Sequence, residues 1–186
     1  MLLHKQCSFA AIFLLVTLQT KSAESDFRIA GFIPSSDLFR DIYGTINPSY
    51  QLEASCDVKK GINVWGNFSY FNAHGHSVPF NNKTWLQIFP ISAGLKYVHS
   101  LRYCFDIYGG AGLCYTWLKE KNKRCLSNVV SNVGGIFKFG IAKQYKCLKL
   151  SLFSDYQLQK FTIKKSGKKK VNANGLLLGG AIGVSF

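Results

Sequence analysis

Apolar side chains recur at every second residue along most of this chain. From Arg102 to Leu118, the odd positions carry aromatic, aliphatic or small residues, while the even positions include Arg102, Asp106 and several glycines. A period of two places successive side chains on opposite faces of an extended strand, whereas a helix repeats about every 3.6 residues. The pattern therefore predicts an all-β chain.

Eight segments share this alternation. They are residues 27–33, 48–57, 62–72, 84–99, 102–118, 133–144, 148–160 and 176–186. Links of two or three residues alternate with longer links at 34–47, 73–83, 119–132 and 163–173, and a helical turn is expected near Ser36 to Tyr43. Short turns at one end and long loops at the other are typical of an eight-stranded antiparallel up-and-down transmembrane β-barrel.

The N-terminus has the composition of a secretory signal peptide. A short segment with one lysine precedes an apolar run from Cys7 to Leu18. A short polar segment follows and ends in the small residues before the expected cleavage site at Ala23. The run is shorter than the ~20 residues that a spanning helix needs, although an uncleaved anchor is the alternative. We expect residues 1–23 to be the signal peptide and residues 24–186 to be a single barrel domain.

The distribution of charge decides which face of the barrel points inward. The chain has a net charge of +14, yet only 17% of its residues are charged, below the ~25% of an ordinary soluble domain. A secreted lipocalin-like barrel would carry a densely charged outer face around an apolar cavity. Here the polar faces hold glycine, serine and isolated charges of both signs, so we expect them to line the lumen. Buried charges must pair, which predicts an ionic network of Arg28, Glu53, Asp57, Lys96, Asp106, Lys138, Lys149 and Asp155.

The last segment ends the chain on Phe186, with Ile182 and Val184 in the same phase. This terminus resembles the C-terminal assembly signal of Gram-negative outer-membrane barrels. With the signal peptide and the eight strands, residues 27–186 resemble the small barrel superfamily that includes the OmpA barrel domain and the OmpX and OmpW types. The resemblance implies a monomer in the bacterial outer membrane, recognised by the assembly machinery through Phe186, with both mature termini in the periplasm.

Several aromatic residues fall in the inward phase, namely Phe32, Trp65, Phe71 and Phe153. An eight-stranded barrel is just wide enough for side chains to fill it. A packed lumen with a structural or surface-interaction role is therefore our first interpretation. A narrow channel, or a site for small hydrophobic solutes as in OmpW-type proteins, is the alternative.

The long loops are strongly basic. Their cations are Lys119, Lys121, Lys123, Arg124, Lys164, Lys165, Lys168, Lys169 and Lys170. Basic clusters near an anionic membrane bind lipid head groups, so these loops could bind lipopolysaccharide, other outer-membrane lipids or an acidic host surface. Equally, they could serve only as solvated tips. Nucleic acid is not an expected partner in this compartment.

A catalytic site is not evident in the sequence. Barrel enzymes that deacylate lipid A use a histidine and a serine two residues apart on one strand, and neither His76-Ser77 nor His99-Ser100 has that spacing. His74 and His76 form a pair without a nearby third metal ligand. We expect no catalytic residues, no metal and no cofactor.

Five cysteines follow the expected signal peptide. If the fifth and sixth strands pair around a loop centred near residue 125, Cys104 lies opposite about residue 146 and could form a disulfide with Cys147. Cys114 could pair with Cys125, which would leave Cys56 unpaired. Free thiols are the alternative for both pairs.

Overall fold

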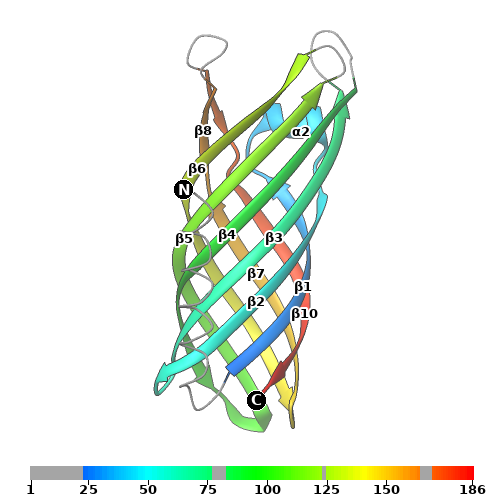
Figure 1. Cartoon of the computed structure of the whole chain (residues 1–186). Helices are drawn as coiled ribbons and strands as arrows, with labels where there is room; N and C mark the ends of the chain where they lie inside the picture. Colours follow the sequence, from blue (N-terminus) through cyan, green and yellow to red (C-terminus); the bar gives the residue numbers. More distant parts are fainter. Residues whose placement is uncertain (1–22, 77–82, 123–124, 164–168) are drawn as a thin grey trace.

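The computed structural model describes residues 23–76, 83–122, 125–163 and 169–186. They form a closed barrel of eight long strands (Figure 1). The strands are β1 (Ala23–Pro34), β2 (Asn47–Lys59), β3 (Ile62–His76), β4 (Lys83–Ser100), β5 (Phe105–Asn122), β6 (Cys125–Tyr145), β7 (Leu148–Leu158) and β10 (Gly175–Ser185). A two-stranded extension consists of β8 (Lys160–Ile163) and β9 (Lys169–Asn172). The predicted all-β class and the eight strands are confirmed.

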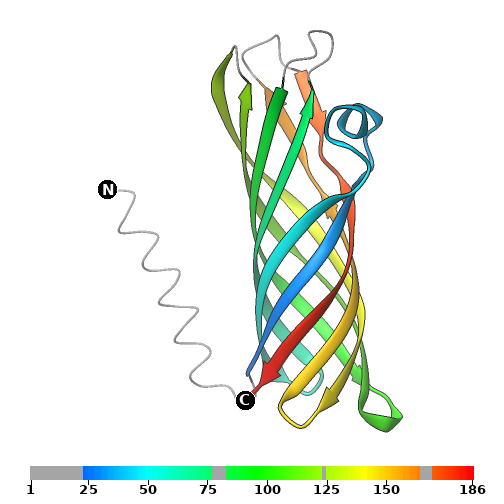
Figure 2. The same ribbon diagram turned by 90° about the vertical axis from the view of Figure 1, so that its right-hand side faces the viewer.

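Every barrel strand pairs antiparallel with its neighbours. β1 closes the sheet on β10 through pairs such as Ala30 with Gly179. The short turns and the two described chain ends lie at one end of the barrel, here called the short-turn end, and the longer connections lie at the other, the loop end (Figure 2). Closure removes exposed strand edges, so the backbone groups of every barrel strand can bond to neighbouring strands on both sides.

Two of the predicted long loops contain strand instead. β5 and β6 continue pairing as far as Asn122 with Cys125, so the loop expected at 119–132 is wrong. β8 and β9 pair within the loop expected at 163–173, from Lys160 with Asn172 to Ile163 with Lys169. Alternation marks a strand only where one face is apolar. We call the exposed apolar side chains of the barrel strands, such as Leu113 and Leu152, the apolar belt. Backbone pairing continues beyond this belt and requires no apolar face.

The expected helical turn is present as α2 (Asp37–Tyr43), which packs at the loop end (Figure 2). Phe39 and Tyr43 are its buried residues, and the chain leaves the helix at Gly44, which has a positive φ of 88°. A Cβ at Gly75 of β3 would collide with the backbone oxygen of Ile42. Gly75 therefore lets the helix approach the strand.

In the described part of the chain, no helix is long and apolar enough to cross a membrane.

The two faces of the barrel are inverted relative to a soluble protein. Large apolar side chains are exposed on the outside, including Leu113 at 70% and Leu152 at 67%, whereas polar residues such as Gln51 and Asn67 are buried inside. The alternation breaks at Cys56. This residue has the phase of the outward-facing Leu52, but both Ser55 and Cys56 are buried, next to a register shift between Asp57 and Lys59.

Gly112 on β5 lies where the barrel interior leaves no room for a side chain. A Cβ there would lie 2.7 Å from Cζ2 of Trp65 and would collide with the backbone oxygen of Ala93. We expect Gly112→Ala to lower the free energy of unfolding by about 1–3 kcal/mol, as overpacking does. Urea unfolding in lipid vesicles would measure it. Gly135→Ala is the matched control because its nearest neighbours are 4.0 Å away, and equal effects of the two changes would contradict the argument.

Candidate functional site

Charged side chains from five strands meet inside the barrel. Among the described residues, four acids and four bases take part in buried or partly buried ion pairs, so their formal charges balance. The acids are Glu24, Asp26, Glu53 and Asp155, and the bases are Arg28, Lys96, Lys138 and Lys149. We call these eight residues the lumen network.

Glu53 of β2 is the centre of this network. Its Oε2 lies 2.7 Å from Nη1 of Arg28 and 2.5 Å from Nζ of Lys138, and its Oε1 lies 3.3 Å from Nζ of Lys96. Asp155 of β7 joins two of the same cations, with Oδ2 at 2.9 Å from Arg28 Nη1 and 3.5 Å from Lys138 Nζ. Lys138 and Asp155 have no exposed surface. Because these side chains have almost no exposed surface, each charge depends on its partners.

A second group of pairs lies closer to the short-turn end. Lys149 Nζ lies 2.5 Å from Oε2 of Glu24 and 3.9 Å from Oδ2 of Asp26. Lys96 links the two groups, because its Nζ is also 3.7 Å from Oε2 of Glu24. The hydroxyl of Ser55 donates to Glu24 at 3.1 Å. The charges therefore form one connected network across the lumen.

Two cations of the network also contact aromatic rings, in addition to their carboxylate partners. The guanidinium carbon of Arg28 lies 3.6 Å from the centre of the Phe153 ring, and Lys138 Nζ lies 4.2 Å from the centre of the Trp65 ring. Such contacts are attractive, and more so when the cation is desolvated. Trp65 itself is fully buried. The charged network and these rings are therefore buried together inside the barrel.

Six of the eight charges expected in the lumen belong to this network. The exceptions are Asp57, which is exposed near the short-turn end, and Asp106, which is half-buried and forms no ion pair with a described residue. Sequence analysis missed Glu24 and Asp26. Both share the inward phase of Arg28, but the first strand was expected to begin only at Phe27, so the phase was not followed to them.

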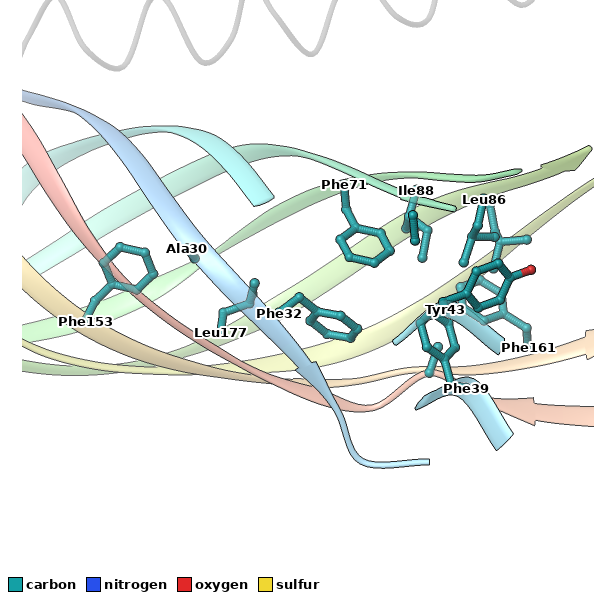
Figure 3. Packing of buried hydrophobic residues seen from close by; sticks show 13 residues of the cluster. Ala30, Phe32, Phe39, Tyr43, Phe71, Leu86, Ile88, Phe153, Phe161 and Leu177 are labelled. Atoms are coloured by element: carbon teal, nitrogen blue, oxygen red, sulfur yellow. The ribbon is translucent and has the colours of Figure 1, made fainter. Parts of the chain in front are cut away.

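The lumen nearer the loop end is apolar. Phe32 of β1 and Phe71 of β3 pack edge to face, with ring centres 5.1 Å apart, and Phe39 of α2 lies 6.1 Å from Phe32 (Figure 3). A cavity of about 20 Å³ among Phe32, Phe71, Phe161 and polar neighbours has room for roughly one water molecule. The four aromatic residues expected inside, Phe32, Trp65, Phe71 and Phe153, are all buried.

Most of the basic loop residues lie outside what the structure describes. Lys119 is half-buried on β5, and the backbones of Lys121, Lys169 and Lys170 belong to strands whose side chains there are not described. Five more lie outside the described residues, namely Lys123, Arg124, Lys164, Lys165 and Lys168. Phe186 is exposed at the short-turn end, where its backbone bonds to Ala23.

Neither of the two possible cysteine pairs forms among the described residues, where the free-thiol alternative is observed. Cys104 and Cys147 are exposed free thiols, and Cys114 is a buried free thiol. Phe105 pairs with Lys143, two positions away from the expected register, and the chain turns out of the strand at Cys104, which has a φ of 60°. Cys114 pairs with Gly134, whereas Cys125 pairs with Asn122, eight positions further along β5.

Of the histidines and serines considered for catalysis or metal binding, those whose side chains the structure describes lie apart from the lumen network. His74 packs edge-on against Trp85 at 6.5 Å, and His99 and Ser100 are exposed at the short-turn end. His76 has no described side chain and Ser77 lies outside the described residues. Within the described ranges, no three His, Cys, Asp or Glu residues come together as metal ligands.

Solved outer-membrane barrels share this architecture. The outer membrane protein OprG of Pseudomonas aeruginosa matches with a TM-score of 0.69 over 89% of this chain and 95% of its own. Neisserial surface protein A matches with 0.61 over 89% and 96%. Ail of Yersinia pestis, crystallised with the heparin analogue sucrose octasulfate, matches with 0.56 over 89% and 98%. Each is 14% identical to this chain. No model of a protein family and no curated protein matches the sequence. The chain has the fold of the small eight-stranded outer-membrane barrels.

Proposed function

We propose that this chain is an outer-membrane protein whose barrel is closed by its own lumen side chains, with a structural or surface-interaction role and no catalytic activity. The observation that carries the proposal is the lumen network, balanced in charge and buried beneath an apolar outer face. In this proposal the apolar belt contacts lipid, and both described chain ends lie on the periplasmic side. The barrel acts as a single chain that the outer-membrane assembly machinery inserts.

A closed lumen follows from the energetics of the network. An ion that crosses it would have to separate pairs such as Glu53 with Lys138, which have almost no exposed surface. Breaking a buried pair leaves an uncompensated charge at a cost of about 3–5 kcal/mol. We therefore propose a packed scaffold and not a pore.

Conductance across a planar lipid bilayer tests this proposal. We expect the refolded full chain to insert without steady ion conductance, because the lumen network and Trp65 fill the cross-section. Insertion is verified by the protein that co-floats with the lipid. A reproducible conducting state of the inserted wild-type barrel would contradict the closed lumen and favour a narrow channel.

The basic loops supply the surface-interaction part of the proposal. We expect the variant Lys164→Gln, Lys165→Gln, Lys168→Gln, Lys169→Gln and Lys170→Gln to bind lipopolysaccharide micelles at least about tenfold more weakly, since each cation near an anionic surface contributes up to about 1 kcal/mol. Fluorescence titration measures the affinity. The control replaces the same five lysines with arginine and keeps the charge. Unchanged affinity of the glutamine variant would show that this loop is only a solvated tip.

A second candidate function is the binding of small hydrophobic molecules at the loop end. The apolar cluster around Phe32 and Phe71 favours it, and a solute larger than a water molecule would enter by displacing these side chains. The fluorescent probe N-phenyl-1-naphthylamine would test it: binding that weakens in Phe71→Ala and not in the outward-facing Phe68→Ala supports a lumen site. No saturable binding to the wild type would contradict this candidate.

A further inference from the structure

The three short turns of the barrel repeat one pattern, in which exposed basic residues follow or flank an exposed large apolar side chain. Val58 and Lys59 are the last residues of β2, and Lys60 follows them. Leu101 and Tyr103 flank Arg102 between β4 and β5, and Tyr145, the last residue of β6, precedes Lys146. Lys143 is exposed just before that third turn. We call Lys59, Lys60, Arg102, Lys143 and Lys146 the turn cations.

The turn cations are distributed around the rim and are scarcely opposed by acids. They lie at or just beyond the ends of β2, β4 and β6, which are spaced two strands apart in the barrel order. The acidic side chains described at this end outside the lumen network are Asp57, which is exposed, and Asp106, which is half-buried. Glu24 and Asp26 are engaged with Lys149 and Lys96. The rim therefore presents a net positive charge directly beside the apolar belt.

In two of the turns, residues other than glycine adopt a backbone conformation that costs free energy. Tyr103 and Lys146 have positive φ angles of 63° and 55°, which favour glycine. At the first turn, the residue with positive φ is a glycine, Gly61 at 79°. The second turn carries Tyr103 and Cys104 at such positions and the third carries Lys146, and Tyr103 is 86% exposed, so packing does not explain its side chain.

Aromatic rings hold two of the cations close to the belt. Lys143 Nζ lies 5.0 Å from the centre of the Phe105 ring, and Lys146 Nζ lies 5.9 Å from that of Tyr145. A ring that enters the interfacial zone of a bilayer beside an ammonium group places the cation at the depth of the lipid phosphates. The arrangement fits a bilayer surface better than free solvent.

From this arrangement we propose that the turn cations form a ring that binds anionic phospholipid head groups of the leaflet at the short-turn end. The apolar residues of the three turns enter the interface, and the cations contact lipid phosphates. The inference rests on the proposed function, because it requires that the barrel span a bilayer. It adds a lipid site at the end opposite the basic loops.

Native mass spectrometry of the refolded full chain tests the ring. The protein in non-ionic detergent is mixed with equal amounts of phosphatidylglycerol and phosphatidylcholine that carry the same acyl chains. We expect the wild type to retain phosphatidylglycerol at least about fivefold over phosphatidylcholine, and a variant with all five turn cations changed to Gln to retain the two about equally. The matched control keeps the charge at every position and changes Lys59→Arg, Lys60→Arg, Arg102→Lys, Lys143→Arg and Lys146→Arg. It should keep the preference.

Two outcomes overturn the ring. One is an unchanged preference in the variant that lacks the turn cations, and the other is an equal loss in the charge-keeping control, which would show that the positive charge at these positions is not the cause of the preference. If that variant does not fold, Lys59→Gln with Lys60→Gln and Lys143→Gln with Lys146→Gln serve instead, and each should lose part of the preference. A gel mobility shift on boiling separates failure of the ring from failure of the proposed function. If a variant keeps the shift and its lipid preference is unchanged, only the ring is refuted. If the wild type shows no shift, the proposed function is refuted.

Discussion

Replacing Glu53 with Gln is expected to lower the free energy of unfolding by about 3–5 kcal/mol, the cost of removing one partner from a buried ion pair. Glu53 lies within 3.3 Å of Arg28, Lys96 and Lys138, and its side chain is almost fully buried. Asp155 keeps contact with only Arg28 and Lys138. The change therefore leaves the lumen with one uncompensated positive charge, and Lys96 loses its partner nearest the centre.

Urea unfolding of the barrel in lipid vesicles measures this loss. Asp57→Asn is the matched control: it removes a carboxylate from the same strand, at an exposed site outside the lumen network, and we expect a change below about 0.5 kcal/mol. The double variant Glu53→Gln with Lys138→Gln should recover part of the stability because it restores charge balance. Equal effects at Glu53 and Asp57 would contradict the central role of Glu53.

Replacing Trp65 with Ala is expected to open the lumen and to cost about 3–5 kcal/mol, as the loss of a large buried aromatic side chain does. Trp65 is fully buried, contacts Lys138, and lies against the strand pair that contains Gly112. Its removal leaves a void beside charged groups, which water can enter. A hydrated path along the network should then conduct ions.

Single-channel recording in planar bilayers and urea unfolding together measure the effect. Trp117→Ala provides the matched control, because Trp117 has the same side chain in the outward phase of β5 and is only half-buried. We expect Trp117→Ala to remain without conductance. A Trp65→Ala barrel that inserts with wild-type stability and no conductance would show that other residues close the lumen.

The sequence predicts the barrel well because the apolar belt imposes a period of two on every spanning strand. The inward phase located Arg28, Glu53 and Asp155 without any knowledge of distances. It did not show which charges meet, since strand register decides that. Glu24 and Asp26 escaped notice because the first strand starts earlier than its apolar pattern does.

Features outside the belt were predicted poorly, for physical reasons. The upper parts of β5 and β6 are paired through their backbones, and no apolar face marks them. The close approach of α2 to Gly75 depends on tertiary packing that a single glycine does not reveal. The possible pairing of Cys104 with Cys147 assumed a register of β5 against β6 that differs by two residues from the observed one.

The mobility of boiled and unboiled samples on an SDS gel tests the central claim most directly. The chain is expressed with its N-terminal segment in a Gram-negative host, and outer membranes are isolated. The account predicts a band in that fraction that migrates faster before boiling than after it, because a closed barrel resists the detergent. A soluble periplasmic protein with no mobility shift would contradict the account, because the exposed apolar face would then have no lipid to contact.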